Sequence, residues 1–386
     1  MSTHYDIIVI GGGIHGVGVA QAAAAAGYSV LTLEKTELAA GTSSKSSKLI
    51  HGGLRYLESG RWRMVRESLL ERAALLRLAP ALVKLTPFFI PIYPTTRRRP
   101  WQIAIGLSLY ALLGGLSKEN RFARVPRDEW DTLDGLDTHG LQAVFRYYDA
   151  QTDDAALTRA VMRSAQSLGA ELRMPARFVA AQRHDDKWNV DYLDGEKPVS
   201  CTTVAIVNAG GAGTNDALEH ITPRPPIFPI ELVQGAHIVV DASTGRGVYY
   251  VEAPDGRAVF VMPWKGKSLV GTTETVVRGG TAAVQPQEIK YLQDIFRHYF
   301  PGKDARVIDS FVGVRVLPSG GSSVFHRSRG AVFLPDDPAR PRLVTIYGGK
   351  LTSYRATAVH VLDLLRAALP TRHRRADTDM LPLTPD

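Results

Sequence analysis

The chain has almost no cysteine, since Cys201 is the only thiol among its 386 residues. One thiol cannot form an internal disulfide, so the sequence excludes a disulfide-stabilised scaffold and fits a reducing compartment. The first predicted strand begins at about Tyr5, which leaves no room for a cleaved signal peptide. We therefore expect a cytoplasmic location.

A strong charge bias and metal-ligand spacings are also missing. The net charge of +8 is a modest bias toward anionic partners. The sequence contains no zinc-finger spacing and no nucleic-acid motif, so we expect neither a bound metal nor a nucleic-acid partner. The length and the 45% hydrophobic content suit a globular protein with two domains.

No hydrophobic run is long enough to predict a membrane span. The longest uncharged segment, residues 100–117, is short and interrupted by glycine. Arg97, Arg98, Arg99 and Trp101 lie at its start, and flanking residues of these kinds are typical of a helix at a membrane surface. Two interpretations stay open: a buried helix of a small insert, or a peripheral contact with the inner face of the cytoplasmic membrane.

The chain opens with an apolar strand over residues 6–10, a glycine turn and an alanine-rich helix. In this pattern Gly11 allows a tight turn, Gly13 lets the backbone approach a pyrophosphate, and Gly16 lets helix and strand pack closely. The second strand ends at Glu34, whose carboxylate can accept hydrogen bonds from a ribose diol. These features together predict a dinucleotide-binding unit, with the pyrophosphate at the helix N-terminus.

Two more predicted strands end in small residues. The strand at 204–208 runs into Ala209 and Gly210, which predicts that this backbone returns to the cofactor. The strand at 343–347 leads through Gly348 and Gly349 into a helix over about 352–369. The N-terminus of that helix would stabilise an anion, and Lys350 adds a full charge.

A third group of candidate residues lies in the segment 46–56. His51 has an ordinary pKa suited to proton transfer near neutrality, and Arg55 offers a bidentate donor for a phosphate or carboxylate. From Pro223 onward the sequence becomes rich in strands, which predicts an antiparallel sheet and a second domain. His237 and Arg315 are candidates from that domain, although each could be a structural hydrogen bonder.

These motifs resemble the FAD-dependent glycerol-3-phosphate dehydrogenases. The resemblance rests on Ile-Gly-Gly-Gly-Ile-His-Gly at 10–16, Ser-Ser-Lys-Leu-Ile-His-Gly-Gly-Leu-Arg-Tyr-Leu at 46–57 and Gly-Gly-Lys-Leu-Thr-Ser-Tyr-Arg at 348–355. The matches keep family order from Tyr5 to about Leu369. This chain ends before the helical C-terminal domain that usually follows in the family.

The resemblance implies an α/β fold with a Rossmann-type FAD-binding domain, similar to glutathione reductase and D-amino-acid oxidase, and an antiparallel-sheet substrate domain. We expect the FAD-binding domain to be discontinuous, over residues 1–90, 149–222 and 330–370. The substrate-binding cap would take residues 91–148 and 223–329. Residues 371–386 are expected to form a flexible tail.

The resemblance also assigns the site residues. Catalysis is assigned to Arg315, His51, His237 and Lys350, and substrate binding to Arg55, Tyr56 and Thr352. A larger set is expected to bind FAD: Gly11, Gly12, Gly13, Ile14, His15, Gly16, Glu34, Lys35, Thr42, Ser43, Ser47, Lys48, Leu49, His51, Gly53, Ala209, Gly210, Gly349, Lys350, Leu351 and Thr352.

The implied reaction is oxidation of sn-glycerol 3-phosphate, a small anionic substrate, to dihydroxyacetone phosphate. A hydride would pass to flavin N5 and the electrons would go on to a membrane quinone, with oxygen as an alternative acceptor. The sequence does not decide whether His51 or His237 is the base. A flavin oxidase or dehydrogenase of another 2-hydroxy acid or an amine, and a non-catalytic FAD-binding interaction protein, stay open as alternatives.

Overall fold

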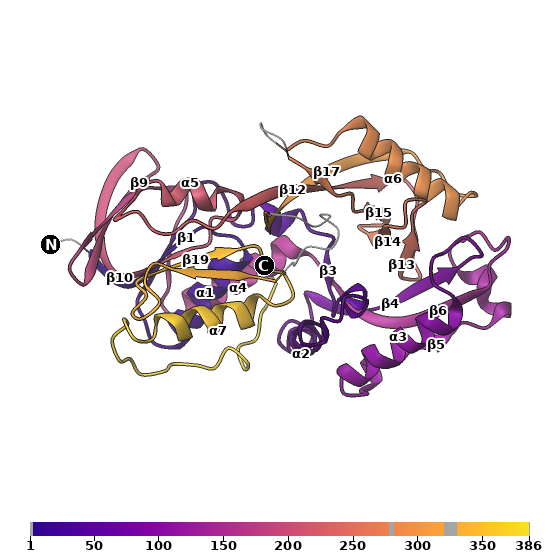
Figure 1. The fold of residues 1–386 in the computed structure, drawn as a ribbon, viewed down its shortest axis with the longest axis horizontal. Coiled ribbons are helices and arrows are strands. Elements are labelled where there is room, and N and C mark those ends of the chain that lie inside the picture. Colours follow the sequence, from indigo (N-terminus) through magenta and orange to yellow (C-terminus); the bar gives the residue numbers. More distant parts are fainter. Residues whose placement is uncertain (1–2, 278–281, 320–329, 386) are drawn as a thin grey trace.

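Two β-sheets lie side by side in the computed structural model, which describes residues 3–277, 282–319 and 330–385 (Figure 1). Within these residues the first sheet has nine strands and the second has ten. β3 (Leu49–Ile50) and the loop before it lie between the two halves of the molecule. This arrangement matches the predicted α/β architecture of a nucleotide-binding half and a second, largely antiparallel half.

The centre of the first sheet is parallel. β1 (Thr3–Ile10) pairs with β2 (Val30–Leu33) on one side and with β10 (Lys197–Asn208) on the other. Ile10 lies opposite both Leu33 and Asn208, so the carboxyl ends of these strands meet at one edge. β19 (Leu343–Tyr347) extends the parallel region beside β10 and ends at the same edge. Ligands of open α/β sheets bind at this kind of edge.

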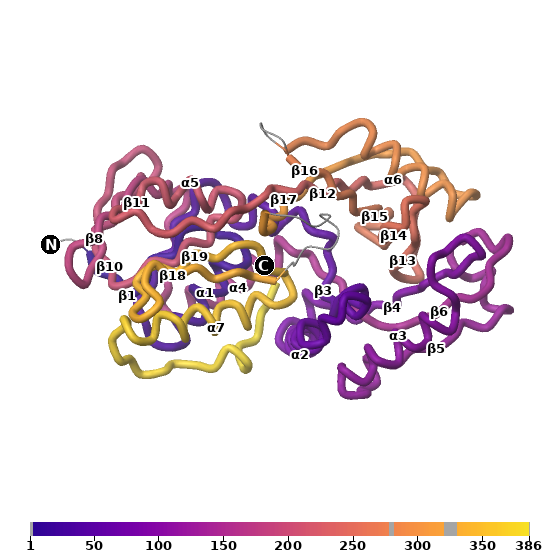
Figure 2. Tube along the Cα trace, viewed as in Figure 1, coloured from indigo at the N-terminus to yellow at the C-terminus, as the bar shows by residue number. Residues whose placement is uncertain are grey.

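Three helices share one hydrophobic core on this sheet: α1 (Ile14–Ala25), α4 (Asp154–Ser167) and α7 (Tyr354–Leu365) (Figure 1). The alanine-rich α1 is buried along almost its whole length, because α4 and α7 both pack against it. Residues 176–184 and 187–194 form an antiparallel hairpin, with the left-handed Asp185 in its turn. The remaining elements of this half, several of them at its outer end in Figure 2, are β7 (Glu171–Arg173), β8 (Ala176–His184), β9 (Lys187–Asp194), η5 (Gly211–Gly213), α5 (Thr214–Leu218), β11 (Ile221–Thr222) and β18 (Val332–Pro335).

The second sheet is built around β12 (Ile230–Val240) and β17 (Val307–Pro318), which pair antiparallel along most of their length. α6 (Pro286–Tyr299) buries its apolar face against this sheet. The other elements of this half are η3 (Lys118–Asn120), β5 (Ala123–Arg124), η4 (Arg127–Thr132), β13 (Val248–Glu252), β14 (Ala258–Trp264), β15 (Lys267–Gly271) and β16 (Thr275–Val276).

The second sheet begins earlier in the chain than residue 91, where the sequence predicts the start of the substrate-binding cap. β4 (Val83–Ile92) and β6 (Ala143–Thr152) pair along their full length and belong to this sheet, so boundaries at residues 90 and 149 would cut through both strands. Pro87 and Pro91 mark a break in the sequence, but both lie inside β4. On its β4 side, β13 pairs only with Phe88 and Phe89, which lie between these prolines. Neither proline therefore interrupts the ladder between β4 and β13.

α2 (Trp62–Leu78) and α3 (Pro100–Leu113) cover the other side of β4 and β6. α3 has one buried face and one exposed face. Leu107 and Tyr110 are 1% exposed, whereas Trp101, Ile105 and Leu112 are 60–64% exposed. In the ranges that the structure describes, no helix is both long and apolar enough to cross a membrane.

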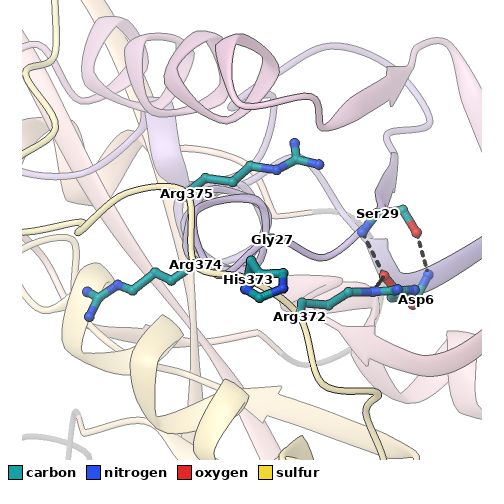
Figure 3. A pocket seen from close by; sticks show the side chains of 7 residues that line it. All are labelled: Asp6, Gly27, Ser29, Arg372, His373, Arg374 and Arg375. Atoms are coloured by element: carbon teal, nitrogen blue, oxygen red, sulfur yellow. Dashed lines mark hydrogen bonds and ion pairs between the residues drawn. The ribbon is translucent and has the colours of Figure 1, made fainter.

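The tail after α7 packs against the first sheet, which corrects the prediction of a loose segment at 371–386. The Arg372 guanidinium forms an ion pair with the buried Asp6 (Figure 3). The backbone N–H of Arg375 donates to the Ala25 carbonyl. Leu383 is buried as well. These partners lie hundreds of residues earlier in the chain, so the local sequence gave no sign of them.

A pocket of about 450 Å³ opens between the tail and the end of α1 (Figure 3). Arg374 extends away from Arg372 and Arg375, so the basic side chains around this pocket do not converge on one point. Each of these arginines also contacts a carboxylate or a carbonyl of the protein. The pocket therefore belongs to the packing of the tail.

Candidate active site

The first glycine turn is closed by contacts that only glycine allows. Gly11 has φ +107°, and a Cβ at this position would lie 2.6 Å from the Ala209 carbonyl oxygen. A Cβ on Gly16 would lie 1.9 Å from the carbonyl oxygen of Gly11. Gly210 follows Ala209, and its N–H donates to the Asn208 side chain. The structure thus brings Ala209 and Gly210 to the turn, as expected from the small residues after β10.

The acid at the end of β2 supports the same turn. Glu34 accepts hydrogen bonds from the N–H of Gly12 at 2.7 Å and from the N–H of Thr36 at 2.8 Å, one on each oxygen. The Thr36 hydroxyl also donates to the oxygen that accepts the Thr36 N–H, at 3.1 Å. A carboxylate oxygen has two lone pairs, so the oxygen bonded to Gly12 can accept a further donor such as a ribose hydroxyl. Lys35 is exposed and points to no partner in the described part of the chain.

The loop after β2 connects the two halves through η1 (Thr42–Ser44). Ser43 Oγ accepts the N–H of Ile14 in the first turn of α1, at 2.9 Å. Thr42 donates to the carbonyl of Val314 in β17. A Cβ on Gly313 would meet the Lys45 carbonyl oxygen at 2.3 Å, so the second sheet touches this loop directly. The loop therefore spans the boundary between the domains at the N-terminus of α1.

The two predicted glycine turns meet in space. A Cβ on Gly349 would lie only 2.3 Å from Nε2 of His15, which stands in the first turn of α1. Gly348 and Gly349 both have positive φ, and the regular helix α7 begins at Tyr354, two residues later than predicted. Burial lowers the pKa of His15 to about 4, and its Nδ1 has no hydrogen-bond partner among the described residues. His15 is therefore neutral, with a polar atom available to a ligand.

These features fit a dinucleotide. The cradle of Gly11, Gly13 and Gly16 leaves the backbone open at the N-terminus of α1, where an anion is stabilised. Glu34 stands at the end of the neighbouring strand, as a ribose contact requires. His15 lies against Gly349, and Gly348 lies against the Val316 carbonyl of β17, so this turn joins the N-terminus of α1 to the second sheet. A cofactor with two nucleotide ends would contact both turns.

The segment before β3 is fixed by a buried ion pair. Lys48 has φ +58° and is 4% exposed, and its Nζ lies 2.6 Å from the Asp154 carboxylate at the start of α4. Ser46 also donates to Asp154, from its hydroxyl and from its backbone N–H. Ser47 then reaches the second domain, with its Oγ 2.9 Å from Nε2 of His237. Leu49 is buried in β3.

The turn after β3 is held from two sides. The His51 N–H donates to Thr352 Oγ1 at 3.2 Å, which ties the turn to the segment before α7. The Gly52 N–H donates to the Tyr110 phenol oxygen of α3 at 2.9 Å. Gly53 has φ +79°, and a Cβ there would meet the ring of Tyr56. The backbone of this turn is therefore fixed between the two domains.

His237 is a buried, neutral histidine. Burial, with Arg315 and Lys48 nearby, lowers the pKa of His237 to about 3. The ring stacks on Phe311 with a centroid distance of 4.9 Å, and its Nδ1 has no hydrogen-bond partner in the described residues. At neutral pH the ring is therefore uncharged, with one N–H and one nitrogen that can accept a proton.

Cationic side chains gather around Tyr56, which belongs to η2 (Leu54–Leu57). The Lys350 Nζ lies 4.3 Å from the centre of the Tyr56 ring and 3.2 Å from Ser68 Oγ. Arg315 donates to Thr272 Oγ1 at 3.1 Å, and burial lowers its pKa to about 10, with Tyr56 and Arg55 as its electrostatic neighbours. The predicted substrate residues thus lie in one region, between the glycine turns and β17.

A buried network behind this region was not predicted. The Tyr110 hydroxyl donates to the Asp149 carboxylate, which forms an ion pair with Arg72 of α2. Burial raises the pKa of Asp149, while the Arg72 charge and the Tyr110 hydrogen bond oppose that rise. Asn120 accepts a further hydrogen bond from Arg72. The only sequence signal was polar residues within apolar segments.

Comparison with known proteins agrees with this geometry. The family model described as "FAD dependent oxidoreductase" matches residues 6–361. D-erythritol 1-phosphate dehydrogenase of Brucella abortus is 36% identical over 378 residues, which is 95% of this chain and 74% of that protein. Aerobic glycerol-3-phosphate dehydrogenase of Escherichia coli is 36% identical over 371 residues, which is 93% of this chain and 73% of that protein.

Solved structures share the fold. The glycerol-3-phosphate dehydrogenase of Bacillus halodurans, solved with FAD, superposes with a TM-score of 0.75 at 24% identity and covers 98% of this chain and 68% of its own. The L-α-glycerophosphate oxidase of Mycoplasma pneumoniae, solved with FAD bound, gives a TM-score of 0.76 at 17% identity over 97% of this chain and 98% of its own.

Proposed function

This chain belongs to the FAD-dependent oxidoreductases, in the glycerol-3-phosphate dehydrogenase family, and from that premise we propose that it oxidises sn-glycerol 3-phosphate to dihydroxyacetone phosphate. FAD is its cofactor, and when bound it supplies a hydride acceptor at flavin N5. Gly11, Gly13, Gly16, His15 and Glu34 are the residues we assign to the nucleotide ends of FAD.

The observation that carries the proposal is the cationic region around Tyr56. The Lys350 ammonium lies over that ring, and Tyr56 and Arg55 are electrostatic neighbours of Arg315. Arg315 comes from β17 of the second sheet and Lys350 from the segment between β19 and α7. Guanidinium groups bind phosphates and carboxylates through paired hydrogen bonds, so this region suits a small phosphorylated polyol. Arg315 and Lys350 would polarise the C2 oxygen as it becomes a carbonyl, and Arg55 with Tyr56 would hold the phosphate.

We assign the proton acceptor to His237. It is neutral, it lies within the field of Arg315, and its Nδ1 has no protein partner in the described structure. Ser47 fixes its ring through Nε2. His51 is the alternative base. Replacing each histidine in turn by glutamine distinguishes them, because the variant that lacks the base should reduce the flavin more slowly at saturating substrate.

For the electron acceptor we propose a membrane quinone, reached from the bilayer surface. The exposed face of α3 supports a peripheral contact, because Trp101, Ile105 and Leu112 lie on one side of the helix and Arg97–Arg99 precede it. Such a helix would rest on the inner face of the cytoplasmic membrane. Oxygen is the competing acceptor, and hydrogen peroxide formation under air would reveal it.

A second substrate is favoured by one specific observation. The relative named D-erythritol 1-phosphate dehydrogenase is as similar to this chain as the relative named aerobic glycerol-3-phosphate dehydrogenase, at 36% identity. The substrates in both names combine a phosphate with a polyol. The cationic region around Tyr56 suits either, so the length of the polyol is what the experiment must resolve.

The test is anaerobic mixing of the purified holoenzyme with single donors, followed by flavin absorbance. We expect rapid bleaching by glycerol 3-phosphate and none by glycerol, which lacks the phosphate. Faster bleaching by D-erythritol 1-phosphate than by glycerol 3-phosphate would identify D-erythritol 1-phosphate as the preferred substrate. Bleaching by 2-hydroxy acids or amines alone would overturn the proposal, and so would a flavin that no donor reduces.

A further inference from the structure

A second cavity lies between η2, α3 and the second sheet, and Arg55, the residue assigned above to the substrate phosphate, is among its lining residues. Its volume is about 400 Å³, which falls in the range of small-molecule pockets, roughly 300–1,000 Å³. Half of its lining residues are aliphatic, and its walls come from five elements: η2, β4, α3, β13 and β14. Leu57, Ile90, Ile92, Ile103 and Leu109 are among them. The cavity therefore suits a hydrocarbon group.

Gly106 leaves one wall of this cavity open. It stands in the middle of α3, where glycine weakens a helix relative to alanine. A Cβ at Gly106 would meet nothing within 4 Å, so no packing in the protein explains the glycine. Other glycines near the site differ, since a Cβ on Gly52 would collide with Tyr110 and Leu69. The empty space beside Gly106 is a place where a ligand could lie against the helix backbone.

Charged residues of both signs line the cavity, Arg97 and Arg98 beside Glu58 and Glu252, and the cavity adjoins the exposed face of α3. Ile105 is 60% exposed and also lines the cavity, so the two apolar surfaces are continuous. Arg98 pairs with Glu58 at 3.3 Å, but both groups are well exposed, and such pairs are weak. No ion pair involves the Arg97 side chain in the described residues.

We propose that this cavity binds one alkyl chain of an amphiphile with an anionic head. The alkyl chain lies along Gly106 between the aliphatic walls, and the head is held at Arg97 and Arg98. The inference goes beyond the proposed oxidation and does not depend on which polyol phosphate is the substrate. The expected ligand has an unbranched hydrocarbon chain of modest length joined to a carboxylate or phosphate.

The experiment uses the FAD-loaded enzyme and dansyl-labelled undecanoate, whose fluorescence rises in an apolar site. We expect saturable binding to the parent protein and at least tenfold weaker binding to Gly106→Leu, because the new side chain fills the groove without displacing protein atoms. Gly302→Leu is the matched control: its Cβ also meets nothing within 4 Å, and it lies outside the cavity. Arg97→Gln should weaken undecanoate several-fold and leave competition by undecanol unchanged.

Two arms identify the source of the ligand. If vesicles of phosphatidylglycerol displace the probe and vesicles of phosphatidylcholine do not, the bound alkyl chain belongs to an anionic phospholipid. If only myristate displaces the probe, the chain belongs to a free fatty acid. Either result supports the anionic amphiphile. Absence of probe binding, equal binding by Gly106→Leu, or displacement of the probe by glycerol 3-phosphate would overturn it.

Flavin bleaching by substrate is measured on the same samples and separates the two proposals. Gly106→Leu should be bleached at the parental rate. A protein that binds the probe but is not reduced by any polyol phosphate contradicts only the proposed function. A protein that is reduced but does not bind the probe contradicts only the amphiphile site.

Discussion

The phenol oxygen of Tyr110 lies 2.9 Å from the backbone nitrogen of Gly52 and accepts its hydrogen bond. The same hydroxyl donates to Asp149 at 2.7 Å. Helix α3 of the second half therefore fixes the turn at residues 51–53. In a trans peptide the N–H and the preceding C=O point in opposite directions. Because the Gly52 N–H is directed at Tyr110, the His51 carbonyl points away from it.

Tyr110→Phe tests this coupling. The change leaves a buried N–H and a buried carboxylate each short of one partner, so we expect unfolding free energy to fall by about 1–3 kcal/mol. We also expect FAD to dissociate several-fold faster, because the turn loses its fixed orientation. Denaturant unfolding and flavin release measure the two effects. Tyr148→Phe, which removes a half-buried neighbouring hydroxyl, is the control and should behave like the parent protein.

Arg315→Ala removes a cation from the region around Tyr56. We expect flavin reduction by substrate to slow by on the order of a hundredfold or more, the scale of one lost contact to developing charge. Anaerobic stopped-flow absorbance gives the rate. Arg306→Ala serves as the matched variant, since that arginine is exposed and pairs only with aspartates at the far end of the second sheet. Parental reduction rates in Arg315→Ala would remove this residue from the site.

The glycine turns were predictable because their causes are local. Gly11 and Gly16 contact residues a few positions away or at the end of a neighbouring strand, and their spacing records this in the sequence. The strand–turn–helix at 343–354 is recognisable for the same reason. The meeting of His15 with Gly349 follows once both strands are placed in one parallel sheet.

The buried charge pairs were not predictable because their partners are distant in the chain. Lys48 and Asp154 are 106 positions apart, and Arg72 and Asp149 are 77 apart. Periodicity predicts which face of an element is apolar, but it does not say which charge a buried lysine will meet. β4 was missed for another reason, since its two prolines are turn signals that this strand tolerates.

Acid pH should destabilise the protein through His237 and His15. Their pKa values fall from the ordinary 6.5 to about 3 and about 4, so the unfolded chain binds more protons than the folded one between those values and 6.5. Stability is therefore complete above pH 6.5 and declines as the pH falls toward 3. At about 1.4 kcal/mol per pKa unit, the loss is on the order of several kcal/mol.

Equilibrium unfolding of the parent and of His237→Gln, followed from pH 7 to pH 4, measures this effect. The variant lacks one titrating group, so its unfolding free energy should change less steeply with pH. Equal slopes for the two proteins would show that the His237 pKa is not depressed in the folded state.

Arg372→Ala tests the docking of the tail. Asp6 is 1% exposed and keeps only the hydrogen bonds from Ser29 when the guanidinium is removed. We expect a loss of about 1–3 kcal/mol, the cost of leaving a buried acceptor without its partner. Arg374→Ala is the control, because its pair with Asp377 is exposed and local and should contribute less than about 1 kcal/mol. Thermal unfolding compares the two variants, and equal melting temperatures would show that the Arg372 pair adds nothing.

The exposed face of α3 gives a prediction about membranes. Replacing Trp101 and Leu112 together by serine removes two large apolar side chains that are 64% and 60% exposed. Burying such side chains contributes roughly 1.5–3 kcal/mol each when complete, so even partial insertion predicts at least about tenfold weaker binding to phosphatidylglycerol vesicles. Cosedimentation measures the bound fraction, and added salt should lower it further because Arg97–Arg99 contribute electrostatically. Ile308→Ser changes an exposed apolar residue of β17 and should leave binding unchanged. Equal binding by the double variant and the parent would mean that this helix face stays in water.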